Sequence, residues 1–129
     1  MMQTFSRLAG AAVVAAVLAA PSTGHAQTAS SAADAAEEKL DYELREVATA
    51  QEKYYVEYNT YARNPRAMLR YYKVPAGTTL VIVNASKTGF SAVMVAAEAP
   101  DVVCGIAVGT ATNPFGGYYK EGKPLCRER

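Results

Sequence analysis

One stretch of this chain, residues 32–58, contains neither glycine nor proline and reads AADAAEEKLDYELREVATAQEKYYVEY. Its large apolar and aromatic residues recur at steps of three and four positions, which is the spacing of a single stripe on an α-helix. A serine at position 30 or 31 can cap the helix start, and Asn59 tolerates the left-handed conformation that ends helices. We therefore predict an amphipathic helix over Ser31–Tyr58, with a stripe made of Leu40, Leu44, Val47, Gln51, Tyr54, Tyr55 and Tyr58.

At about 1.5 Å per residue this helix would be roughly 42 Å long, so we expect its first part to project beyond the rest of the fold. Before Leu40 the stripe offers only alanines, which supports that expectation. The other end of the helix is rich in tyrosine, whose ring packs on apolar surface while its hydroxyl finds a polar partner. We expect these rings to cover the rim of a sheet; they belong to Tyr54, Tyr55, Tyr58 and Tyr61.

The second half of the chain contains three segments with the composition of β-strands. They span 78–84, 90–97 and 102–110, and short polar turns separate them. Short turns join antiparallel neighbours, and the helix is the element available to cover one face of such a sheet. The fold class is thus α+β, with the helix packed on three to four antiparallel strands. Between helix and sheet, residues around 68–72 can form a short helical turn or an edge segment, and 111–129 reads as a loop.

The first 26 residues have the pattern of a secretory signal peptide. Arg7 precedes an uncharged run of 13 residues over 8–20, and small residues stand near Ala26 at the expected cleavage point. A run this short is below the roughly 20 residues that a membrane-spanning helix needs. We therefore predict export to the periplasm or the cell exterior, a mature domain over 27–129 with a flexible leader at 27–33, and no stable membrane span after cleavage. A retained membrane anchor is the alternative.

The chain has two cysteines, Cys104 in the third predicted strand and Cys126 near the end. In an exported protein such a pair predicts a disulfide, which here would tie down the glycine-rich final segment. Free thiols or a bond between two chains are the alternatives.

Charge is unevenly distributed along the mature chain, although its total is zero. Residues 27–57 hold eight acidic and three basic residues, whereas 58–129 hold four acidic and nine basic ones. The balanced total argues against a dedicated nucleic-acid-binding protein. The asymmetry indicates either an acidic helix that lies on a basic body or a dipole that attracts a partner.

Little in the sequence points to catalysis. The single histidine, His25, falls in the predicted signal peptide, so a histidine base or imidazole metal ligand is not expected in the mature chain. Phosphate-loop and dinucleotide motifs are absent from the sequence. The acidic group Glu37, Glu38 and Asp41 fits a solvated helix face. We therefore predict a non-enzymatic protein with no catalytic residue, cofactor or metal.

Two segments are candidates for binding. The first is basic and interleaved with tyrosines, a combination that can hold anionic polymers or sugars; the alternative is a solvated loop that faces the acidic helix. The second carries aromatic side chains inside the predicted disulfide loop, where they could contact a partner or fold back on the sheet. The candidate residues are Arg63, Arg66, Arg70, Tyr71, Tyr72 and Lys73 in the first segment, and Phe115, Tyr118 and Tyr119 in the second.

These features together resemble the globular part of type IV pilins and pseudopilins over about residues 35–129. The matching residues are Tyr54 and Tyr55, the segment Thr60-Tyr61-Ala62, the strand block 79–108, and Cys104 with Cys126. The resemblance implies a structural or interaction protein that self-associates or docks to a cell-surface or filament partner. A small secreted module that binds glycan or another polyanion through 63–73 is the alternative function.

The chain departs from the pilin pattern at its start. Pilins keep a hydrophobic helix after cleavage beside a glycine and carry a glutamate five positions on, whereas Gly10 is followed here by Ala15 at that position. The resemblance therefore implies a pilin-like head with a cleavable signal peptide in place of the pilin helix. Pilin-like heads sometimes bind calcium through a C-terminal loop, but 113–121 contains a single acidic residue, so no calcium site is expected.

Overall fold

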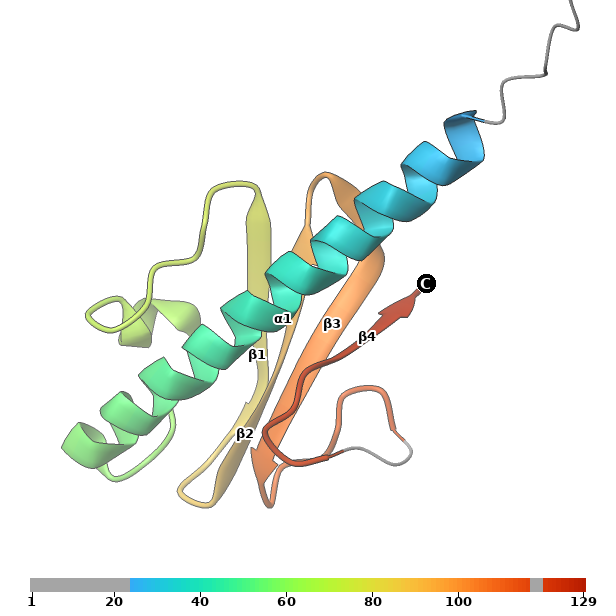
Figure 1. Ribbon diagram of the computed structural model, residues 1–129. Helices are drawn as coiled ribbons and strands as arrows, with labels where there is room; N and C mark the ends of the chain where they lie inside the picture. Colours follow the sequence, from blue (N-terminus) through green and yellow to red (C-terminus); the bar gives the residue numbers. More distant parts are fainter. Residues whose placement is uncertain (1–23, 117–119) are drawn as a thin grey trace, which may run out of the picture.

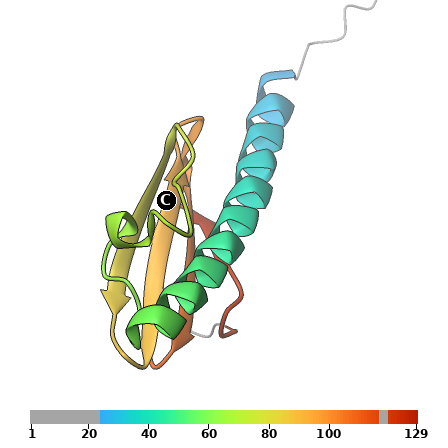
Figure 2. The same cartoon turned by 90° about the vertical axis from the view of Figure 1, so that its left-hand side faces the viewer.

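A computed structural model describes residues 24–116 and 120–129, with side chains from residue 31 onward. The predicted signal peptide therefore lies almost entirely outside the described residues, as do Tyr118 and Tyr119. The fold is α+β: helix α1 packs on one face of a four-stranded antiparallel sheet (Figures 1 and 2). The elements are α1 (Gly24–Tyr58), the 3-10 helix η1 (Pro65–Met68), and strands β1 (Thr78–Ala85), β2 (Gly89–Ala96), β3 (Ala99–Gly109) and β4 (Leu125–Glu128).

Helix α1 begins at Gly24, seven positions before the predicted start at Ser31. The predicted leader 27–33 is therefore part of the helix. Physically, Gly24 is the last glycine before Tyr58 and no proline intervenes, so nothing in 25–30 interrupts helical hydrogen bonding. The helix ends where the sequence predicts: Asn59 has a φ of 56°, and its N–H donates to the carbonyl of Tyr55 at 2.7 Å.

The buried face of α1 follows the predicted stripe over its middle turns. These side chains pack against apolar residues of η1 and of strands β1 to β3, and together they form the core. Tyr58, placed on the stripe by its spacing, is instead more than half exposed, because it lies on the last turn, where its ring meets Tyr54 rather than the sheet. The largest core side chains are Leu40, Leu44, Val47, Met68, Phe90, Met94 and Ile106.

The sheet has the order β1-β2-β3-β4, so each strand pairs with its neighbours along the chain. The first two strands match the predicted segments to within a residue. Strand β3 starts at Ala99, three residues before the predicted 102, because Ala96 already pairs with Ala99 across a turn of only two residues. Strand β4 corrects the interpretation of 111–129 as a loop, since Leu125–Glu128 pairs antiparallel with β3.

The disulfide between Cys104 and Cys126 is present, as predicted, and it joins residues directly opposite each other on β3 and β4. Strand β4 is short and mostly exposed, and this bond fixes its register against a buried strand. It is also the last strand of the sheet in the described part of the chain, so its outer side is a sheet edge.

Helix α1 crosses the sheet obliquely, and its first turns extend past the strands (Figure 1). The first buried side chain of the helix is Ala36, so the turns ahead of it contribute little to the core. The expectation of a projecting helix start is thus met in the described residues.

Candidate functional site

The tyrosines around the helix end bind the chain back onto α1. The Tyr72 hydroxyl donates to Glu43 at 2.6 Å, and the Tyr71 hydroxyl donates to Glu57. Both glutamates therefore lie on the side of α1 that faces the segment after η1. The predicted basic binding segment is therefore, in part, the fold's own contact with its acidic helix.

A third tyrosine makes the same kind of bond through a different glutamate. The Tyr61 hydroxyl donates to Glu52 at 2.9 Å, while its ring lies 5.1 Å from Phe90 and 4.9 Å from Tyr55, measured between ring centres. Tyr61 thus connects the helix to β2, as expected of a ring that covers the rim of the sheet, whereas Tyr58 contacts Tyr54 instead.

These contacts shift the proton affinities of the groups involved. Burial, together with the bond to Glu52, raises the pKa of Tyr61 to about 12. Burial and the bond to Glu43 likewise raise the pKa of Tyr72. The hydrogen bond from Tyr71 lowers the pKa of Glu57, and the nearby Arg70 guanidinium acts in the same direction. Tyr61 and Tyr72, on opposite sides of the helix, therefore hold their protons more tightly than an exposed tyrosine does.

The basic residues of 63–73 divide into two groups. Arg70 pairs with Glu57 at 3.2 Å, whereas Arg63, Arg66 and Lys73 are exposed and form no ion pair with any residue that the structure describes. Three of the four basic side chains of this segment are thus free to contact a ligand. The fourth, Arg70, lies against the helix together with Tyr71 and Tyr72.

Phe115, the described aromatic of the second candidate segment, folds back on the sheet. Its ring lies over Gly105, where an added Cβ would come within 3.1 Å of the ring, and the Arg127 guanidinium lies 4.3 Å from the ring centre. The buried Asn113 holds this turn, since its side-chain oxygen accepts from Phe115 N–H and its amide donates to Gly116. Of the two alternatives for Phe115, packing on the sheet is the one observed.

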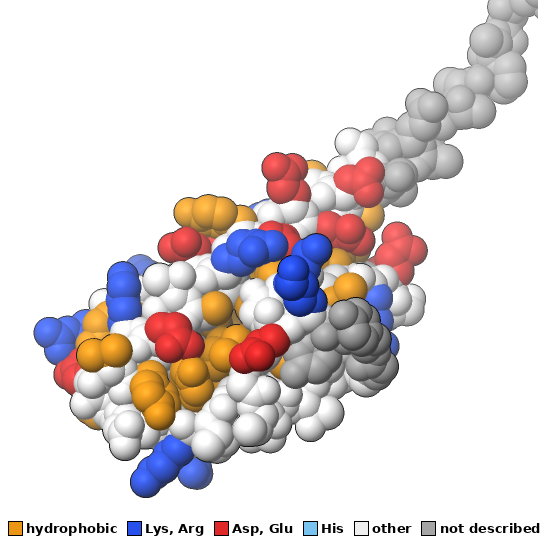
Figure 3. Space-filling model, turned by 60° about the horizontal axis from the view of Figure 1, so that its bottom comes forward, with side chains coloured by type: hydrophobic (Ala, Val, Ile, Leu, Met, Phe, Trp, Pro, Cys, Tyr) orange, Lys and Arg blue, Asp and Glu red, His pale blue; other side chains and the backbone are white. Residues whose placement is uncertain are grey.

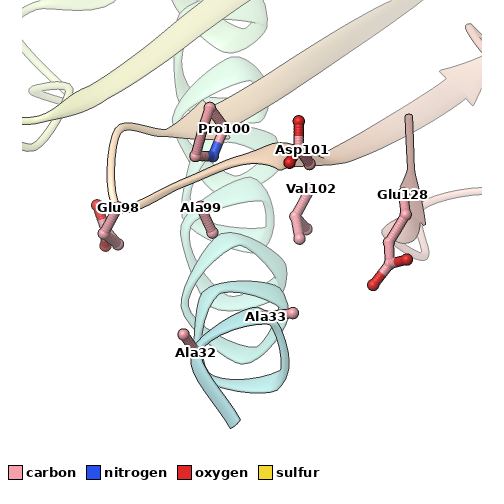
Figure 4. Close-up of a pocket in the computed structure, with 8 residues that line it drawn as sticks. All are labelled: Ala32, Ala33, Glu98, Ala99, Pro100, Asp101, Val102 and Glu128. Carbon is pink, nitrogen blue, oxygen red and sulfur yellow. The ribbon is translucent and has the colours of Figure 1, made fainter. Parts of the chain in front are cut away.

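Two hollows lie along the gap between α1 and β4, which the sequence did not single out. The larger, of about 490 Å³, is where the projecting turns of α1 pass over the ends of β3 and β4. In Figure 4, Val102 points toward the helix, while Glu98 and Glu128 stand on either side of it. The lining residues are Ala32, Ala33, Glu98, Ala99, Pro100, Asp101, Val102 and Glu128.

The smaller hollow, of about 360 Å³, follows further along the helix. It is lined by acidic side chains of α1 on one side and by the start of β4 on the other: Glu37, Glu38, Asp41, Pro124, Leu125 and Cys126. We call the two hollows together the α1–β4 groove. In the sequence its acidic residues match a solvated helix face, and no periodic pattern marks β4, so the groove has no signature in the sequence alone.

Charged groups of both signs lie along this face of the molecule. Figure 3 shows acidic side chains around the projecting part of α1, with Lys and Arg side chains close to them and also beside hydrophobic side chains at the opposite end. One ion pair, Lys39–Glu98 at 2.9 Å, links the helix to the β2–β3 turn.

No group of three or more histidine, cysteine, aspartate or glutamate side chains is placed to hold a metal ion within residues 24–116 and 120–129. In the same described ranges, no helix combines the length and apolar character needed to cross a membrane.

No protein-family model matches this sequence, and no curated protein matches it either.

Proposed function

We propose that this chain is a non-enzymatic interaction protein that is exported and docks to a protein partner at the cell surface or on a filament. The α1–β4 groove carries the proposal, because it combines a hollow beneath a helix with the edge of a sheet. An unpaired sheet edge is a ready template for another polypeptide, and proteins that do not use such an edge usually block it. Here the short β4 leaves that edge open in the described residues.

The pilin-like interpretation is part of this proposal and is supported by the sequence motifs. The helix on an antiparallel sheet, its buried stripe and the disulfide of the last strand are compatible with a pilin-like head. Because Ala15 replaces the expected glutamate, the proposed protein docks as a released head rather than through a retained hydrophobic helix.

Photo-cross-linking in cells that produce the protein tests the docking. Leu125 lines the groove and is 44% exposed, and Val81 on β1 provides a matched control with 48% exposure outside the groove. We expect a photoreactive residue at 125 to form a defined adduct with another protein, and one at 81 to form none. Equal adducts from both positions, or none from either, would contradict the proposal.

Export is tested by mapping the mature N-terminus with mass spectrometry. We expect a start near Gln27, as the signal-peptide pattern predicts. A start near Ala11 would instead restore assembly through a retained pilin helix.

A second candidate function, binding of glycan or another polyanion, is supported by the three exposed cations Arg63, Arg66 and Lys73. Replacing all three with serine should lower the salt concentration needed to elute the protein from heparin. The matched control replaces three exposed lysines elsewhere, Lys87, Lys120 and Lys123. Equal losses in both triple variants would show that binding follows total charge and not this segment.

A further inference from the structure

We infer that the α1–β4 groove binds an extended basic segment of a partner protein, which adds to the sheet as a new strand beside β4. This inference rests on the proposed function and names the chemistry of the partner at the same groove. It follows from three properties of the groove: the backbone groups at its edge, its shape and its charge.

The backbone of β4 presents hydrogen-bonding groups to the groove. The N–H of Arg129 donates to the carbonyl of Asp101 at 2.8 Å, so this opposed pair is a hydrogen-bonded one. Hydrogen-bonded and non-hydrogen-bonded pairs alternate along an antiparallel ladder. Cys126 and Glu128 therefore direct their N–H and C=O groups away from β3, and no described residue pairs with them there.

The shape of the groove suits an extended chain. A new strand would lie about 4.8 Å from β4. The two hollows, of about 490 and 360 Å³, lie one after the other beside β4. The walls of the first include Ala32 of α1 and Glu128 of β4, and those of the second include Asp41 of α1 and Leu125 of β4. Apolar groups such as Ala33, Val102 and Leu125 contribute to their walls.

The charge of the groove identifies its occupant as basic. Glu37 and Glu38 project from the helix and Glu128 from β4, and none of the three forms an ion pair with a described residue. Asp41, by contrast, is already paired with Arg45 at 2.7 Å. In an added strand every second side chain points toward α1, so lysine or arginine at alternate positions would meet the free carboxylates.

The same charges disfavour pairing of β4 with β4 of a second copy. That arrangement would bring Glu128 and the acidic helix of each copy toward their counterparts, and like charges placed close together cost free energy. A segment of another protein that carries the opposite charge satisfies both the edge and the carboxylates.

The probe is a short synthetic peptide that alternates lysine and threonine, titrated into the isotope-labelled mature chain and followed by NMR. We expect the amide signals of Cys126 and Glu128 to move on binding. Two further peptides carry N-methyl groups on all lysines or on all threonines. In an added strand, the backbone N–H groups of either the lysines or the threonines face β4, and those of the other residue type face away. One methylated peptide should therefore bind at least about tenfold more weakly than the parent peptide, and the other should bind as the parent does. Equal affinities for all three peptides would show charge attraction without strand addition and would overturn the inference.

Substitutions locate the site. Glu128→Gln should weaken binding of the parent peptide, whereas Glu46→Gln, on an exposed part of the helix outside the groove, should leave it unchanged. If the two substitutions weakened peptide binding equally, the assignment of the site would be overturned. It would also be overturned if the Cys126 and Glu128 signals moved with protein concentration in the absence of peptide, because a second copy would then occupy the edge of β4. A specific cross-link at Leu125 without peptide binding would leave the proposed function standing and refute only this inference.

Discussion

A single buried glutamine fixes the chain as it leaves the helix. Gln51 is fully buried, its side-chain amide donates to the carbonyl of Ala62 at 2.9 Å, and its side-chain oxygen accepts from Ala62 N–H at 2.7 Å. Both polar groups of one backbone residue are thereby satisfied away from water, where leaving them unpaired is costly. The apolar stripe of α1 can include this polar residue because Ala62, eleven positions further along the chain, hydrogen-bonds both polar groups of its side chain.

The first prediction concerns this residue. Gln51→Met keeps nearly the same shape but removes both hydrogen bonds, and it leaves Ala62 N–H and C=O buried without partners. We expect the free energy of unfolding to fall by about 2–4 kcal/mol in chemical denaturation. Lys53→Met, an exposed substitution two positions away, is the control and should change it by less than about 0.5 kcal/mol. Similar losses in both variants would assign the effect to the helix and not to the bonds.

At the scale of elements, tyrosine–glutamate bonds hold α1 on both of its flanks. Glu43 and Glu57 receive hydroxyls on one side, and Glu52 receives the hydroxyl of Tyr61 on the other. Each bond requires a neutral phenol, because a phenolate beside a carboxylate would repel it. The attachment of the helix should therefore weaken at alkaline pH.

As the second prediction, we expect this weakening to occur between pH 10 and about pH 12. An exposed tyrosine titrates near pH 10, and the pKa of Tyr61 in the fold is about 12. Because the folded state holds this proton more tightly, the stabilisation is complete below pH 10 and is lost as the pH rises toward 12. In denaturation curves over this range, Tyr61→Phe should lose stability less steeply than the unaltered chain. Tyr42→Phe, at an exposed position, should follow the unaltered chain; a Tyr61→Phe curve of the same slope would contradict the prediction.

The third prediction concerns β4, whose four residues depend on the disulfide for their register. Replacing Cys104 and Cys126 together with alanine removes a link across 22 positions, and we expect the free energy of unfolding to fall by roughly 3 kcal/mol. Hydrogen exchange should accelerate at Val103 and Arg127, which pair across β3 and β4, and change little between β1 and β2. Retained protection at Arg127 would show that β4 pairs without the disulfide.

The elements differ in how far the sequence predicts them. The middle of α1 and the first two strands are marked by periodicity and by turn residues such as Gly89, and their positions agree closely with prediction. Strand β4 carries no such mark, since Leu-Cys-Arg-Glu is short and follows Gly122 and Pro124. Its strand conformation comes from pairing with β3, which local sequence does not encode.

The candidate site shows the same division. One of the two alternatives predicted for segment 63–73 was that it faces the acidic helix, because opposite charges attract. Which glutamate each tyrosine meets depends on the path of the chain through η1, and sequence spacing does not determine that path. The α1–β4 groove was not predicted at all, because it arises from the angle between a helix and an edge strand.

At the scale of the whole molecule, α1 is anchored over only part of its length. Leu40, Leu44 and Val47 are fully buried, whereas the described side chains before Ala33 are exposed. Helical turns that bury no apolar surface are held mainly by their own hydrogen bonds and open more readily than packed ones.

The fourth prediction follows from this difference. Amide hydrogen exchange should divide the helix near Ala36, with fast exchange at 27–32 and exchange near the global unfolding limit at 44–51. Amides of β2, which is central and largely buried, serve as the reference for the slow class. Uniform slow exchange along the whole helix would mean that its first turns are covered in solution, for example by a second copy.

The oblique course of α1 also separates two places where the molecule can be held. Over its 35 residues the helix spans about 50 Å, with Gly24 at one end and the turn at Asn59 at the other. If a partner holds the mature chain by the start of α1, the helix acts as a spacer. The segment that carries Arg63 and Arg66 follows the other end of the helix, so it lies away from that partner (Figure 1).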